Sequence, residues 1–69
     1  MERTPVTSSN VKSVGHDKDS NTLEVEFSSG DLYQYDGVGQ EDYAELMEAQ
    51  SIGKHINTKI KPKFKARRL

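Results

Sequence analysis

The chain has 69 residues, with 11 acidic side chains, 10 Lys or Arg side chains and no cysteine. This length suffices for one small domain and excludes a second one. Leu, Ile, Val and Phe account for only 14 of the 69 residues, which predicts a thin core, but the net charge of −1 still allows folding. Without cysteine the chain lacks disulfides, thiolate metal ligands and a cysteine nucleophile. Since it shows neither an apolar run of about 18 residues nor a signal-peptide pattern, we expect a cytoplasmic protein that does not span a membrane.

Charge is distributed unevenly along the chain. Residues 1–53 contain all 11 acidic side chains and three basic ones, whereas residues 54–69 contain seven basic side chains and no acidic one. The seven basic residues are Lys54, Lys59, Lys61, Lys63, Lys65, Arg67 and Arg68. An acidic body with a basic end is an indication about binding partners and not about the fold.

The first part of the chain predicts an arm and a strand. Residues 1–9 are polar and include Pro5, so we expect a loose N-terminal arm that only Val6 could anchor. Residues 11–17 form the first expected strand. Residues 17–21 follow with Asp, Ser and Asn, whose short side chains bond to their own backbone in turns.

A β-hairpin comes next. Residues 23–27 alternate between apolar and acidic side chains, which is the period of a strand with one buried face. A glycine-containing turn separates them from a second, aromatic-rich strand at 32–35. The sequence leaves open which face of this second strand points toward the core: the face with Tyr33 and Tyr35, or the face with Leu32 and Gln34.

The spacing of apolar residues then becomes helical. Tyr43, Leu46, Met47 and Gln50 fall on one stripe. A second helix begins after Ser51 and ends near Ile60 or Lys61, because Pro62 disfavours helical backbone in the residue before it. Its apolar stripe consists of Ile52, Ile56 and Ile60.

These elements predict an α+β fold: a three-stranded antiparallel β-meander followed by one or two short helices packed on one sheet face. We expect a flexible arm over residues 1–9, a single domain over 10–61 and a basic C-terminal tail over 62–69, from which Phe64 could fold back onto the core. The residues expected to be buried together are Leu23, Val25, Phe27, Leu46 and Ile56.

The sequence resembles the KTSC domain, a family named for its occurrence at the C-terminus of some lysyl-tRNA synthetases and also found as small stand-alone proteins of bacteria and phages. The resemblance covers about residues 6–64. It rests on Ser13-Val14-Gly15-His16-Asp17, Leu23-Glu24-Val25-Glu26-Phe27, Ser29-Gly30, Tyr33-Gln34-Tyr35, Val38, Tyr43, Leu46, Ala49, Ser51, Gly53, Asn57 and Ile60-Lys61. The association with synthetases implies an RNA-related role.

The chain departs from the family pattern at a few positions. It has His16 where the family usually has an aromatic residue, and Gly39 where the family usually has proline. His55 and Ile56 stand where the family favours aromatic residues. Fewer aromatic rings at these places mean fewer surfaces on which a base could stack.

Motifs for metal binding or catalysis are incomplete. Asp17-x-Asp19-x-Asn21 begins like a calcium loop, but Thr22 and Ser28 stand where such a loop needs glycine and glutamate, so a turn is the better interpretation. The two histidines, His16 and His55, have no further ligands at zinc-site spacing. Neither a nucleophile elbow nor a P-loop is present. We therefore expect no enzyme activity, no metal, no cofactor and no small-molecule substrate.

Two functions remain, both of a non-enzymatic binding module. In the first, the module contacts RNA, or a protein associated with nucleic acid, through the seven basic residues of positions 54–69, because lysine and arginine bind phosphates. In the second, it is a bacterial or phage-encoded regulator or adaptor whose acidic surface binds a protein partner. The candidate residues for that surface are Glu24, Glu26, Tyr33 and Tyr35. The sequence does not predict an oligomeric state.

Overall fold

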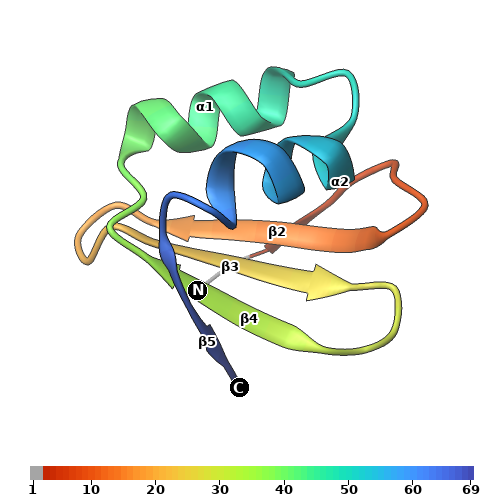
Figure 1. Cartoon of the computed structure of the whole chain (residues 1–69), viewed down its shortest axis with the longest axis horizontal. Helices are drawn as coiled ribbons and strands as arrows, with labels where there is room; N and C mark the ends of the chain where they lie inside the picture. Colours follow the sequence, from red (N-terminus) through yellow and green to blue (C-terminus); the bar gives the residue numbers. More distant parts are fainter. Residues whose placement is uncertain (1–2) are drawn as a thin grey trace.

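The computed structural model describes residues 3–69 and consists of an antiparallel sheet with helices on one face (Figure 1). The elements are β1 (Arg3–Pro5), β2 (Val11–Asp17), β3 (Thr22–Phe27), β4 (Leu32–Asp36), α1 (Gln40–Glu48), α2 (Ile52–His55), the π-helical turn η1 (Ile56–Ile60) and β5 (Lys65–Arg68). The strands lie in the order β1-β2-β3-β4-β5, so each strand pairs with the next one along the chain. The helices lie within the connection from β4 to β5.

The three central strands confirm the predicted meander. In the turn between β2 and β3, the Asp19 backbone N–H donates to the Asp17 carboxylate at 3.0 Å, and Asn21 adopts a φ of 53°. In the turn between β3 and β4, Gly30 has a φ of 95°, a conformation that glycine adopts without a steric penalty. Both turns therefore use the residue types from which they were predicted.

The sheet has five strands, so the predicted number of three is corrected. Part of the expected arm forms β1 and pairs with β2, while Lys65–Arg68 of the expected basic tail forms β5 and pairs with β4. Phe64, just before β5, packs against the core. The two outer strands were missed because they are short, polar edge strands that are held by backbone pairing and show no apolar alternation.

The second helix begins after Ser51, as predicted, and both helices have a capping contact at their start. The Asp42 carboxylate accepts from the Gly39 backbone N–H at 3.2 Å at the start of α1, and Ser51 accepts from the Lys54 backbone N–H at 3.3 Å at the start of α2. The second helix is not uniformly α-helical, since its second half is the π-helical η1.

The core lies between the helices and one face of the sheet. It consists of Val11, Val14, Leu23, Val25, Tyr35, Val38, Leu46, Ile52, Ile56 and Ile60. Four of the five residues expected to be buried together belong to it, whereas Phe27 is half-buried and packs at its margin. No helix within residues 3–69 is long and apolar enough to cross a membrane.

The strand register answers the question about the second hairpin strand. Tyr35 lies opposite Leu23 and Tyr33 lies opposite Val25, so both tyrosines share the helix-covered face. Tyr35 is only 2% exposed.

Candidate binding site

The open face of the sheet, which the helices do not cover, carries a network of paired charges. Arg3 lies 3.2 Å from the Glu24 carboxylate, to which the Gln34 side-chain amide also donates at 3.0 Å. Arg67 donates to the Gln34 side chain at 3.1 Å and to Asp36 at 2.8 Å. The charges on this face are therefore largely matched within the molecule.

The residues predicted for protein binding are not brought together. Glu24 and Glu26 lie on the open face, where the Ser13 hydroxyl donates to Glu26 at 3.0 Å. Tyr33 and Tyr35 lie on the opposite, helix-covered face. A single partner surface cannot contact all four side chains on one side of the sheet.

The seven predicted basic residues also divide into two groups. Arg67 and Arg68 form ion pairs with Asp36 and Asp31 at 2.8 and 2.9 Å. Within residues 3–69, no ion pair is formed by the other members of the set, and we call these five residues the lysine group. They are Lys54, Lys59, Lys61, Lys63 and Lys65, all of them exposed. Unmatched positive charge is thus concentrated on α2, η1 and the residues from Lys61 to Lys65, the first residue of β5.

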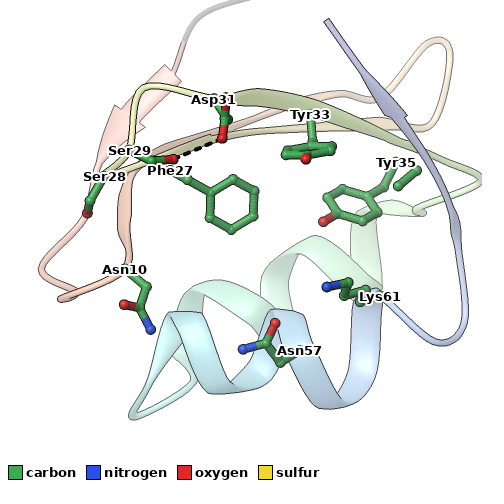
Figure 2. A pocket seen from close by; sticks show the side chains of 10 residues that line it. Asn10, Phe27, Ser28, Ser29, Asp31, Tyr33, Tyr35, Asn57 and Lys61 are labelled. Carbon is green, nitrogen blue, oxygen red and sulfur yellow. Dashed lines mark hydrogen bonds between the residues drawn. The ribbon is translucent and has the colours of Figure 1, made fainter.

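A pocket of about 400 Å³ opens between the sheet and η1, and Lys61 is the member of the lysine group that lines it (Figure 2). Its sheet side presents the aromatic rings of Phe27, Tyr33 and Tyr35. The Phe27 and Tyr33 rings stand edge to face, with centroids 5.4 Å apart and an angle of 83° between their planes. A flat ligand that stacks on one of these rings, on the side where the other stands, therefore presents its edge to the face of that other ring.

The opposite side of the pocket is polar. Asn57 from η1, Lys61 just after η1 and Asn10 just before β2 face the three rings (Figure 2). Asn57 and Lys61 lie together because they are four residues apart in the helical segment. This segment contains the wide π-helical turn, in which the Lys61 backbone N–H donates to the carbonyl of Ile56 at 2.7 Å. Such turns occur frequently at functional sites.

The Tyr35 hydroxyl also belongs to the pocket. Figure 2 shows its oxygen turned toward the side where Asn57 and Lys61 lie. Burial raises the pKa of Tyr35 above the ordinary value of 10.0, and the neighbouring Tyr33 raises it further. A hydroxyl that opens into a pocket can donate to a ligand there and accept from it.

One carboxylate lies at the rim of the pocket, and both of its oxygens are engaged. The Ser29 hydroxyl donates to one Asp31 oxygen at 3.1 Å, and Arg68 donates to the other at 2.9 Å (Figure 2 shows the first contact). Asp31 therefore repels a nearby anion less than an unpaired carboxylate would.

The two histidines occupy other places. His16 lies 2.7 Å from the Val38 carbonyl oxygen through Nε2, and its ring stacks on Tyr43 with centroids 5.0 Å apart. His55 belongs to α2, away from the pocket lining. Within the part of the chain that the structure describes, no three His, Cys, Asp or Glu side chains form a cluster of the kind that holds a metal ion.

Sequence reasoning identified part of this site. It singled out Tyr33, Tyr35 and Lys61 but not the two asparagines. Two signals pointed to Asn57: its place in the KTSC resemblance and its four-residue spacing from Lys61. Asn10 reaches the pocket only through the tertiary fold.

Comparisons with known proteins agree with this architecture. A crystal structure of a KTSC domain protein from Yersinia pestis superimposes with a TM-score of 0.94 at 38% sequence identity, covering 99% of this chain and 96% of that one. A protein of Stutzerimonas stutzeri is 47% identical over 62 residues, which span 90% of this chain and 87% of the relative. A lysine–tRNA ligase of Nostoc punctiforme is 38% identical over 59 residues, which span 86% of this chain but 10% of the ligase. The sequence model of the KTSC domain matches residues 7–64, and the chain therefore belongs to the KTSC domain family.

Proposed function

We propose that this protein is a small, non-enzymatic cytoplasmic module that binds single-stranded RNA. The observation that carries the proposal is the position of Lys61, a member of the lysine group, in the lining of a pocket with three aromatic rings. Lysines bind the phosphates of a nucleic acid by displacing counterions, and aromatic rings provide stacking surfaces for unpaired bases. The similarity to one segment of a lysine–tRNA ligase, an enzyme that handles RNA, supports the same class of partner.

The distribution of acidic residues is compatible with this proposal. Glu24 and Glu26 lie on the open face, on the other side of the sheet from the pocket. Repulsion between their carboxylates and a strand at the pocket is weakened further because Glu24 is paired with Arg3. The two arginines of β5 are already paired, so the proposal assigns phosphate binding chiefly to the lysines.

The dependence of affinity on salt tests this function. If Lys59, Lys61 and Lys63 each contact one phosphate, the logarithm of the binding constant should fall with the logarithm of salt concentration with a slope of about −2. The measurement is a titration of labelled single-stranded RNA with the full chain at several salt concentrations. Lys61→Ala should weaken binding and make the slope shallower by about 0.7.

Lys18→Ala provides the matched control. Lys18 is also exposed, but it lies in the turn between β2 and β3, at the opposite end of β3 from the Ser28–Asp31 turn that borders the pocket. This variant should bind RNA with unchanged affinity and slope. The absence of RNA binding at low salt, or an equal effect of the two substitutions, would refute the proposal.

The protein-partner function is the alternative outcome of this test. It has weaker support, because the Glu24 and Glu26 carboxylates are engaged within the molecule and the two tyrosines face the other way. A pull-down from cell lysate with and without nuclease separates the two functions. A partner protein that is retained after nuclease treatment would favour the protein-binding function, whereas loss of all partners would favour the RNA-binding function.

A further inference from the structure

We infer that the pocket between the sheet and η1 is a site for one unstacked nucleobase together with its phosphate. This inference rests on the proposed RNA function and assigns the pocket a specific ligand. The volume of the pocket, about 400 Å³, is at the small end of the range of roughly 300–1,000 Å³ for ligand sites. A site of this size suits a single nucleotide better than a long segment of a partner.

The aromatic side of the pocket fits a flat ring. Phe27 is half-buried and Tyr33 is partly buried, so each ring is held by the core on one side while still lining the pocket. Because the two rings are nearly perpendicular, a base stacked on one of them is bounded laterally by the other. Stacking of this kind tolerates any base, since every base has a π-face.

The polar side of the pocket fits the edge of a base. The side-chain amides of Asn10 and Asn57 each offer donors and an acceptor, and the Tyr35 hydroxyl offers both. A base edge carries donors and acceptors in the same plane as its ring. An aliphatic or phenyl side chain of a protein partner would instead bury these groups without hydrogen bonds, which costs free energy.

The charge at the pocket fits a phosphate. Lys61 lines the pocket and has no ion-pair partner within residues 3–69. Its ammonium group has three donors for phosphate oxygens. Since both oxygens of Asp31 are occupied, the remaining charge at the pocket is positive. The ligand chemistry is therefore a nucleobase linked to an anion, as found in RNA and in free nucleotides.

The test compares ligands that differ in one feature. The full chain is titrated with a short single-stranded RNA, with an abasic ribose-phosphate oligomer of the same length and charge, and with each of the four nucleoside monophosphates. NMR chemical shifts of the backbone amides report which residues contact each ligand. We expect the abasic oligomer to bind roughly 5- to 150-fold more weakly than the RNA, which is the effect of losing one stacked base.

Two substitutions locate the effect in the pocket. Tyr35→Phe removes only the hydroxyl, and Asn57→Ala changes an exposed residue of η1, so neither should prevent folding. Each should reduce the difference between the RNA and the abasic oligomer. Thr58→Ala is the control, because Thr58 is the exposed neighbour of Asn57 and does not line this pocket.

The outcomes separate the inference from the proposed function. Equal binding of RNA and abasic oligomer, without shifts at Tyr33 or Asn57, would overturn the nucleobase site and leave RNA binding by lysines intact. Binding of monophosphates in the pocket without binding of RNA would support the nucleobase site and refute the RNA function. The absence of binding by every ligand would overturn both.

Discussion

Truncation of Leu46 tests the packing of α1 most directly. Leu46 is the buried residue of α1 and has an exposed fraction of 0%. Replacing a buried leucine by alanine costs about 2–5 kcal/mol, through lost apolar burial and the cavity that remains. A domain of this length has a free energy of unfolding of roughly 3–10 kcal/mol, at about 0.05–0.15 kcal/mol per residue. Leu46→Ala should therefore remove a large share of the total stability.

Urea denaturation followed by circular dichroism measures this loss. With a slope near 1 kcal/mol per molar urea, typical of a small domain, the midpoint should fall by about 2 M or more. Glu45→Ala is the control on the same helix, because Glu45 is exposed and its loss should change the free energy by no more than about 0.5 kcal/mol. If the two variants unfolded at the same midpoint, α1 would not be held by Leu46, and the two-layer core described above would be incorrect.

Four further predictions follow from individual contacts. The folded-state pKa of Tyr35 is raised above 10.0, so the stability that its neutral form provides is fully present below pH 10 and is lost as the pH rises through the folded-state pKa. Urea midpoints measured below and above this range should show the loss in the unsubstituted protein. The Tyr35→Phe variant, which has no hydroxyl to ionise, should not show it. Ser51→Ala should cost about 1 kcal/mol in the same assay, because it removes the cap of α2. Arg68→Ala should cost less than about 0.5 kcal/mol, because its ion pair with Asp31 is exposed, and a larger loss would mean that this pair anchors the strand. Deletion of residues 65–69 removes β5 and should lower the melting temperature by at least about 4 °C, the shift that 1 kcal/mol produces in a domain of this size; an unchanged value would show that β5 does not stabilise the sheet.

The sequence was sufficient to predict the central strands and both helices. The strand at 23–27 and the two helices carry periodic apolar residues, whereas the strand at 11–17 was predicted without a clean alternation. Residues 23–27 alternate with period two, and Ile52, Ile56 and Ile60 repeat every four positions. All the residues of these two stripes except Phe27 are buried, as expected. Phe27 differs because its ring forms part of a pocket wall, and a strand pattern cannot show where the covering helix ends.

The outer strands could not be predicted from periodicity. The sequence Lys65-Ala66-Arg67-Arg68 has no apolar alternation, and all four residues are exposed in β5. The pairing of β5 with β4 depends on backbone N–H and C=O groups, which every sequence has. It also depends on the side chains of Asp36 and Asp31, which form ion pairs with Arg67 and Arg68. The basic composition, which suggested a tail, matches the acidic residues of β4 and the preceding turn.

The two β-tyrosines show a different limit. Both faces of residues 32–35 offer side chains that could be buried, so local hydrophobicity did not decide between them. The register with β3 decides which face is buried, because Tyr35 lies opposite the buried Leu23 and therefore on the face that the helices cover. The same register brings Tyr33 beside Phe27 and creates the aromatic side of the pocket.

The charge asymmetry of the sequence is redistributed by folding. Three carboxylates of the sheet and its turn are matched by Arg3, Arg67 and Arg68, so neither the acidic body nor the basic end persists as a simple block. The exposed acidic residues of α1 instead lie on a helix next to the one that carries Lys54 and continues into η1 with Lys59. A polyanion is repelled by the first helix and attracted by the second. The electrostatically favourable side for a polyanion is therefore that of α2 and η1, and Lys61, which follows η1, faces the aromatic rings of the pocket.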